Sequence, residues 1–145
     1  MPSTFNLEIV TPEKLFFNQA VEMLIFKTPD GEIGILKNHA PVVAAVISSS
    51  IRIKLGDSKL DSKQGTVDGW KTASVASGFA QVTNDRVVLL VDSAEWPEDI
   101  DISRALEAKK RAEERLQGAL NSLEQAQSEA ALSRALARLA TKDFN

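Results

Sequence analysis

The chain has 145 residues, 43% of them apolar and 26% charged, and its formal net charge of −3 gives no reason to expect a nucleic-acid partner. Because it contains no cysteine, disulfides, thiolate zinc sites and cysteine nucleophiles are excluded. No apolar run approaches the ~18 to 20 residues of a membrane span, and the first residues lack a signal-peptide layout, so any membrane association is expected to be peripheral.

Residues 1–92 are patterned as a series of short β-strands. Apolar and polar side chains alternate over residues 5–9 and 21–25, and the sequence Thr-Pro-Asp-Gly that follows predicts a tight reversal. Residues 62–70 are polar and are interpreted as a loop or a strand edge. Roughly eight to ten strands in this length predict two packed sheets or a flattened barrel, and we expect a β-sandwich. The other predicted strands are residues 33–36, 42–47, 51–55, 72–76, 79–82 and 87–91, with turns at residues 56–58 and 83–85.

The strand pattern stops after Ser93, and the rest of the chain is patterned as helix. Residues 93–101 form a predicted linker in which Asp99 or Asp101 can cap the first helix. Ser122 and Gln125 have the spacing of a capping box that would start a second helix. Residues 102–145 therefore predict an antiparallel hairpin, which we expect to dock weakly and to move because its apolar stripes are rich in alanine. The stripes are Ile102, Ala105, Leu106, Ala112, Leu116, Ala119, Leu120 and Leu123, then Leu132, Ala135, Leu136 and Leu139.

One motif connects these two parts to a known family. Residues 31–41 read Gly-Glu-Ile-Gly-Ile-Leu-Lys-Asn-His-Ala-Pro. With the strand-rich first part and the helical second part, this stretch resembles the epsilon subunit of bacterial F-type ATP synthases, whose β-sandwich carries Gly-Glu-Leu-Gly-Ile-Leu-Pro-Gly-His-Ala-Pro. Lys37 and Asn38 replace Pro-Gly, although Asn38 still tolerates a left-handed backbone. The resemblance implies a rotor-stalk subunit whose sandwich binds the γ subunit and the c-ring, with Glu32 and His39 at the c-ring contact.

The resemblance also implies a regulatory ATP site on the hairpin. Epsilon subunits that bind ATP carry an Ile/Leu-Asp-x-x-Arg-Ala motif at the start of the first helix, a glutamate before it, an arginine further along, and two arginines four residues apart in the second helix. Guanidinium groups bind phosphate oxygens in bidentate fashion, and a carboxylate can read an adenine edge or a ribose. No magnesium cradle is apparent, so we expect ATP to bind without hydrolysis and without a required metal. The matching residues are Glu95, Ile100, Asp101, Arg104, Ala105, Arg111, Arg134 and Arg138.

We expect no catalytic role for the chain itself. His39 is the only histidine, and the sequence has no Gly-x-Ser-x-Gly, no His-Glu-x-x-His and no P-loop motif. Asp99 and Asp101 could be imagined as metal ligands, but helix capping is the better interpretation because no further ligand recurs at a suitable spacing.

The same resemblance implies a subunit of a proton-translocating ATP synthase at the cytoplasmic face of the bacterial cell membrane. It also implies that the hairpin folds onto the sandwich when ATP is bound, and otherwise extends along γ toward the α/β catalytic subunits and inhibits ATP hydrolysis. Two alternatives stay open: a constitutive epsilon subunit without a nucleotide site, and a sandwich with a coiled-coil adaptor outside ATP synthase. In the first, the arginines would pair with Glu95, Asp101, Glu107 and Glu129 and need no ligand.

Overall fold

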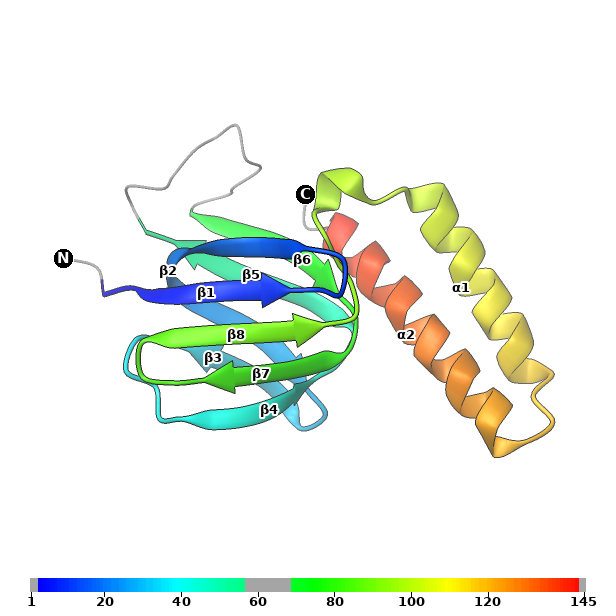
Figure 1. Cartoon of the computed structure of the whole chain (residues 1–145). Coiled ribbons are helices and arrows are strands. Elements are labelled where there is room, and N and C mark those ends of the chain that lie inside the picture. The colour runs from blue at the N-terminus through cyan, green and yellow to red at the C-terminus, as the bar shows by residue number, and fades with distance from the viewer. Residues whose placement is uncertain (1–2, 57–68, 144–145) are drawn as a thin grey trace.

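The computed structural model describes residues 3–56 and 69–143, and it confirms a β-sandwich followed by two C-terminal helices (Figure 1). The predicted turn at residues 56–58 and the predicted loop at residues 62–70 fall largely outside the described residues. Among the described residues, no helix is both long and apolar enough to cross a membrane. The elements are β1 (Phe5–Val10), β2 (Leu15–Thr28), β3 (Gly31–Ile35), β4 (Val42–Val46), β5 (Ser49–Leu55), β6 (Trp70–Val75), β7 (Gly78–Val82), β8 (Arg86–Val91), β9 (Ala94–Glu95), the 3-10 turn η3 (Pro97–Asp99), α1 (Ile102–Gln117) and α2 (Ser122–Asp143).

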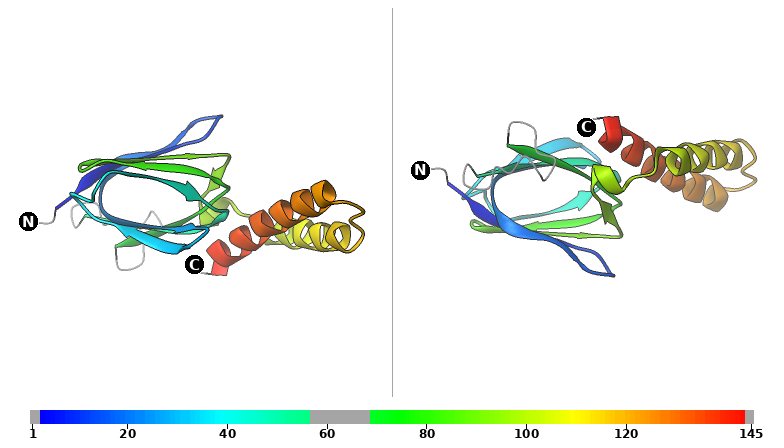
Figure 2. Two further views of the ribbon diagram at one scale, coloured as in Figure 1. Left: turned by 90° about the horizontal axis from the view of Figure 1, so that it is seen from below. Right: turned by 90° about the horizontal axis from the view of Figure 1, so that it is seen from above.

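The described strands form one curled sheet that folds into two layers (Figure 2). Their order is β4-β7-β8-β1-β2-β5-β6-β9, and β3 also pairs with β2. The long strand β2 joins the layers, because its first half pairs with β1 and its second half with β3 and β5. Its register with β5 shifts between Val21 and Met23, where the strand passes from one layer to the other. The pair β1 and β8 is parallel, and the other described pairs are antiparallel.

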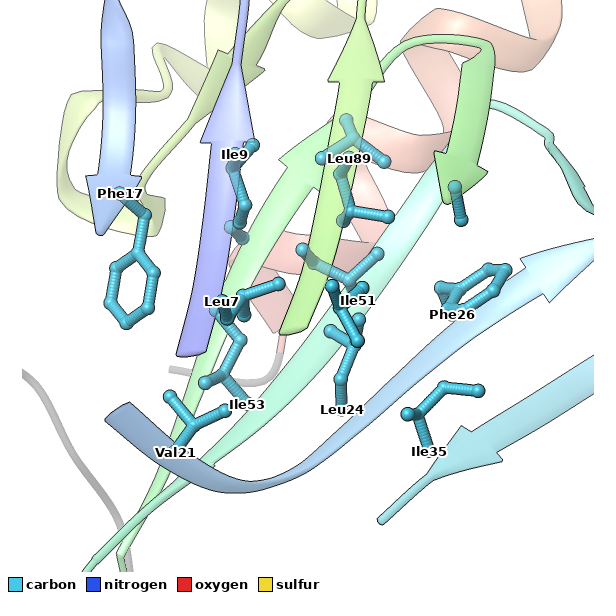
Figure 3. Packing of buried hydrophobic residues seen from close by; sticks show 14 of the residues in the cluster. Leu7, Ile9, Phe17, Val21, Leu24, Phe26, Ile35, Ile51, Ile53 and Leu89 are labelled. Atoms are coloured by element: carbon cyan, nitrogen blue, oxygen red, sulfur yellow. The ribbon is translucent and has the colours of Figure 1, made fainter. Parts of the chain in front are cut away.

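The hydrophobic core lies between the two layers (Figure 3). The predicted alternation in β1 and β5 places Leu7, Ile9, Ile51 and Ile53 inside, fully buried, while the residues between them stay half-buried. Every fully packed member of this core cluster comes from the strands between Phe5 and Val91. The sandwich therefore has a core of its own to which the hairpin contributes nothing.

The predicted linker is fixed to the sandwich along much of its length. It contains β9, which pairs with the edge of β6. The Trp96 ring stacks on Phe16 with 4.3 Å between the ring centroids, and Pro97 and Ile100 are buried. Phe16 itself lies in the first part of β2, which begins before the strand predicted at residues 21–25.

The two helices are capped by polar side chains. Asp101 caps α1, as predicted, by accepting a hydrogen bond from the Arg104 amide at 3.2 Å. The cap predicted for α2 at Ser122 and Gln125 is wrong by one residue. Asn121 accepts from the Glu124 amide at 2.8 Å, and the Glu124 carboxylate accepts from the Leu120 amide at 2.9 Å; asparagine and serine are comparably good N-caps, so either position could have served.

Helix α2 lies between α1 and the sandwich, where it packs on β5 and β6 (Figure 1). The residues buried on the helices are small: Ala105 and Ala112 of α1, and Ser128, Ala135, Ala137 and Thr141 of α2. The predicted stripes are therefore only partly correct, because closely spaced helices bury their alanines and turn the flanking large side chains to solvent. Ile102, Leu106, Leu120, Leu123 and Leu136 are 45% to 89% exposed.

Candidate functional site

A cavity of about 470 Å³ opens between the sandwich and the helical hairpin. Three parts of the fold form its walls, namely the sandwich edge at β6 and β9, helix α1 and helix α2. The helix residues that face it are mainly alanines and arginines, so the short side chains leave space and the long ones reach across it. The lining residues are Ser74, Val75, Ala76, Ser93, Glu95, Ala108, Arg111, Ala112, Arg115, Ala131, Arg134, Ala135 and Arg138.

Four arginines line this cavity, two from each helix. Arg111 and Arg115 lie four residues apart on α1, and Arg134 and Arg138 lie four apart on α2, so each pair projects from one helical face. Arg138 pairs with Glu95, with Nε 2.8 Å from Oε1, and its Nη2 donates to Oε2 at 3.1 Å. Within the part of the chain that the structure describes, Arg111, Arg115 and Arg134 form no ion pair.

The charge balance of the cavity favours an anionic ligand. Four guanidinium groups face the single carboxylate of Glu95, which one of them already neutralises. Bringing the other three close together costs Coulomb energy that a ligand with several negative charges would remove. Ser74 and Ser93 add hydroxyl groups at the sandwich wall, beside Glu95. Residues 3–56 and 69–143 hold no cluster of three or more potential metal ligands.

The structure brings four of the predicted ATP residues together, namely Glu95, Arg111, Arg134 and Arg138. The other four do not line the cavity. Ile100 is buried at the start of the hairpin, Asp101 caps α1, Arg104 is exposed in its first turn, and Ala105 is buried against α2. The contact of these four residues with a nucleotide stays a prediction.

Arg115 is the cavity residue that the sequence analysis missed. It stands one helical turn after Arg111, and the spacing of four residues was the available signal. The family motif includes Arg111 but not Arg115, so the sequence analysis did not assign Arg115 to the site.

Glu32 and His39 flank the edge strand β3. Glu32 lies in the strand, opposite Lys27 of β2, and forms a 3.4 Å ion pair with Arg52. His39 lies beyond the other end of β3, where its Nδ1 is 2.7 Å from the Ala40 carbonyl oxygen. Asn38 before it has φ of 66°, the left-handed conformation expected when asparagine replaces glycine in this motif. The two candidate rotor residues therefore lie beyond or near opposite ends of β3, and their shared contact with the c-ring stays a prediction.

A second surface of the sandwich is apolar and exposed. Cross-strand register places Ala45, Phe79, Leu90, Val10 and Leu15 in one row over β4, β7, β8, β1 and β2. Phe79, Leu90 and Leu15 are 61%, 50% and 54% exposed. A contiguous apolar row of this kind is typical of a protein interface.

Comparisons with known proteins agree along the whole described chain. Residues 4–97 match the family described as ATP synthase, Delta/Epsilon chain, beta-sandwich domain, and residues 98–143 match its long alpha-helix domain. The chain is 49% identical over 137 residues to the ATP synthase epsilon chain of Ruminiclostridium cellulolyticum, covering 94% of both. It is 43% identical over 141 residues to that of Caldicellulosiruptor bescii, covering 97% of this chain and 95% of the relative.

Solved structures show the same fold at much lower identity. A chain of the Euglena gracilis mitochondrial ATP synthase, solved as an OSCP/F1/c-ring assembly, superposes with a TM-score of 0.77 at 20% identity, covering 97% of this chain and 82% of that one. A chain of the Tetrahymena thermophila mitochondrial ATP synthase central stalk and c-ring superposes with a TM-score of 0.61 at 13% identity, covering 95% and 96%.

Proposed function

The chain belongs to the family of ATP synthase epsilon chains, and on that premise we propose that it is a non-catalytic rotor subunit whose hairpin inhibits ATP hydrolysis unless ATP holds it on the sandwich. As a central-stalk subunit it would couple the catalytic head to the c-ring of a proton-translocating enzyme. The proposal includes a peripheral position at the cytoplasmic face of the bacterial cell membrane.

One observation carries the regulatory part of the proposal. The arginine-lined cavity takes its walls from the sandwich, α1 and α2 at once. A ligand in this cavity can contact all three walls only while the hairpin is docked. It would therefore bind the docked form more tightly than the undocked form, and this difference in affinity would shift the equilibrium toward docking. At ~100 times its dissociation constant, ATP would stabilise the docked form by about 2.7 kcal/mol.

That gain is large relative to the contacts that dock the hairpin. Helix α2 meets the sandwich and α1 through alanine, serine and threonine side chains, which bury little apolar area. The polar links, from Arg138 to Glu95 and from Lys142 to the Pro97 carbonyl oxygen, are only partly buried. A partly exposed ion pair contributes roughly 0 to 1 kcal/mol, so we infer that the docked state depends on a ligand.

The proposed partners correspond to separate surfaces. The apolar row around Phe79 and Leu90 suits the γ subunit, and the edge with Glu32 and His39 suits the polar loops of the c-ring. When extended, the hairpin would bury Leu120 and Leu123, now 89% and 66% exposed at its tip, against γ and the α/β subunits. The two mitochondrial ATP synthase structures with the same fold also include a c-ring.

Calorimetric titration of the full chain with ATP, ADP and GTP, followed by hydrolysis assays of the reconstituted enzyme, tests this proposal. We expect ATP to bind, and we expect hydrolysis to become faster when the hairpin is removed. A chain that assembles but binds no nucleotide at millimolar concentration would be a constitutive epsilon subunit, and the regulatory proposal would be wrong.

A further inference from the structure

We propose that Trp96 is a positioning residue for the helical hairpin. Its ring fixes the linker to the sandwich, and the fixed linker presents to α2 the two oxygen acceptors that hold this helix in the docked state. Trp96 acts within the proposed regulation by the hairpin, on which this inference rests, and it is not one of the residues that match the family's ATP motif. The supporting observations are the contacts of the ring, the backbone conformation at Trp96 and the positions of the two acceptors.

The Trp96 ring is held by side chains from both layers of the sandwich. Phe16, in the first half of β2, stacks on the ring with 4.3 Å between the centroids, and Phe17 meets the ring edge-on at 6.0 Å. The Nζ atom of Lys71 in β6 lies over the ring, 4.1 Å from its centroid. Because Phe16 covers one face, the ammonium group lies over the other face in a cation–π contact. The ring is thus enclosed on both faces by the sandwich.

The strand that precedes Trp96 is too short to hold the linker alone. β9 has two residues, and its ladder with β6 joins Ala94 to Val75 and Glu95 to Ser74. This is shorter than most β-strands, and the last pair of such a ladder frays easily. A tryptophan ring buries far more area than two ladder pairs, so the contacts of Trp96 keep the end of β9 on the sheet.

The two acceptors that α2 binds stand directly before and after Trp96. The Nε atom of Arg138 is 2.8 Å from Glu95 Oε1, and Lys142 donates from Nζ to the Pro97 carbonyl oxygen at 2.9 Å. The backbone of Trp96 is extended, with φ of −77° and ψ of 153°, so consecutive side chains point to opposite sides. With the Trp96 ring on Phe16, the Glu95 carboxylate is turned away from the sandwich and toward α2.

Fixing one ring therefore orders both acceptors before α2 docks. Without it, the linker would lose its conformational freedom at the moment of docking, and this entropy cost would oppose the docked state. The sandwich has its own core, so the linker up to Trp96 stays on the sandwich when the hairpin leaves it. Loss of the ring should consequently change the docking equilibrium, and not only the stability of the sandwich.

The test measures the docked fraction of the full chain. Spin labels at Asp30→Cys in the sandwich and Lys110→Cys in α1, both exposed in a chain without cysteine, report docking through their separation in double electron–electron resonance. The docked fraction is measured first without nucleotide. If the wild type is then mainly undocked, the ATP concentration that gives half docking becomes the readout. Urea unfolding of each variant gives the stability of the sandwich separately.

Three variants and one matched control are compared in this labelled chain. Trp96→Ala removes the ring, Phe16→Ala removes its stacking partner from another strand, and Trp96→Phe keeps an aromatic ring on Phe16. Trp70→Ala is the control, because the other tryptophan also has a lysine over its ring, with Lys54 Nζ 5.9 Å from the centroid. Trp70 begins β6, whereas β9 pairs with the last two residues of that strand.

We expect Trp96→Ala and Phe16→Ala each to lower the docking constant about tenfold, the usual effect of having to order one more residue. Trp96→Phe should stay within about threefold of wild type, and Trp70→Ala should leave docking unchanged. If Trp96→Ala lowers only the stability of the sandwich, or if Trp70→Ala impairs docking equally, the inference is overturned. If the wild type docks equally well with and without ATP, the proposed regulation fails and the variants still decide the role of Trp96. A wild-type chain that is undocked under both conditions overturns both.

Discussion

Arg138 near the end of α2 and Glu95 of β9 form the ion pair that joins the hairpin to the sandwich, with 2.8 Å between Nε and Oε1. One turn later, Lys142 donates from Nζ to the Pro97 carbonyl oxygen at 2.9 Å. Both acceptors belong to the linker that Trp96 holds against Phe16. The last turns of α2 are therefore attached to the rigid part of the molecule, directly beside the arginine-lined cavity.

We predict that Arg138→Gln weakens both docking and ATP binding. The change leaves the half-buried Glu95 carboxylate without its partner and removes a phosphate-binding group, so ATP affinity should fall by about tenfold in calorimetry. Glu95→Arg combined with Arg138→Glu provides the control, because the reversed pair should restore docking without nucleotide but not ATP affinity. If the Arg138→Gln variant bound ATP with the same affinity as the wild type, Arg138 would not contact the nucleotide and would serve only to attach the hairpin to the sandwich.

Truncation should separate the stability of the sandwich from that of the hairpin. A chain ending at Asp92 should fold, because the core cluster comes from strands up to Val91. A chain ending at Asp101 should be more stable by about 2 kcal/mol or more, since it keeps the Trp96 ring on Phe16 and buries Pro97 and Ile100. Urea unfolding of the two fragments gives the difference. Equal unfolding free energies would contradict a linker that is fixed to the sandwich.

Substitutions of two neighbouring serines should have opposite effects on the stability of the chain. They border a cleft of about 390 Å³ along α2, where the Ser50 hydroxyl is buried with no hydrogen-bond partner among the described residues, whereas Ser49 donates to the Ile47 carbonyl oxygen at 2.9 Å. Ser50→Ala should stabilise the chain by roughly 1 kcal/mol, because it removes an unsatisfied polar group, and Ser49→Ala should destabilise it by about the same amount. Thermal unfolding of both variants provides the measurement. Destabilisation by Ser50→Ala would mean that this hydroxyl is satisfied in solution.

The rotor contact should be independent of the nucleotide site. Glu32→Ala and His39→Ala, alone and together, should weaken attachment to the membrane sector and leave ATP affinity unchanged, because Glu32 in β3 and His39 in the loop after it do not line the cavity. Glu107→Ala on the exposed surface of α1 is the control for loss of an acidic side chain. Attachment can be measured by sedimentation of reconstituted complexes with c-ring vesicles. Full attachment of the double variant would refute the assignment of this edge to the c-ring.

The sequence predicts those parts of the fold in which apolar side chains recur at one regular spacing, every second residue in a strand or every three to four residues in a helix. Alternation identified β1 and β5 because every second side chain there enters the core. Alternation did not identify the first part of β2, because two aromatic residues are adjacent there and Asn18, Gln19 and Ala20 follow them, so apolar and polar residues do not alternate. In the hairpin, periodicity located the helices and placed Ala105 and Ala112 in the apolar stripe, but it did not separate these buried alanines from leucines such as Leu120, which are exposed.

The candidate site was only partly predictable for a similar reason. The family motif relates residues by their positions in the chain. Four of the residues it groups, Glu95, Arg111, Arg134 and Arg138, line one cavity, and their contact with a nucleotide stays a prediction. The helix cap at Asp101 was predicted separately, from its position just before α1, whereas the motif could not show that Arg115 lines the cavity, because that depends on how the helices pack on the sandwich.

The most direct test of ATP-dependent closure is the distance between the hairpin and the sandwich in solution. The chain has no cysteine, so spin labels can be placed at Asp30→Cys and Ala140→Cys, both exposed, and their separation measured by double electron–electron resonance as ATP is added. The account predicts a broad distribution that narrows to one short distance with ATP, and a Arg134→Ala variant that needs about tenfold more ATP for the same change. The same distance distribution with and without saturating ATP, in wild type and variant alike, would contradict it.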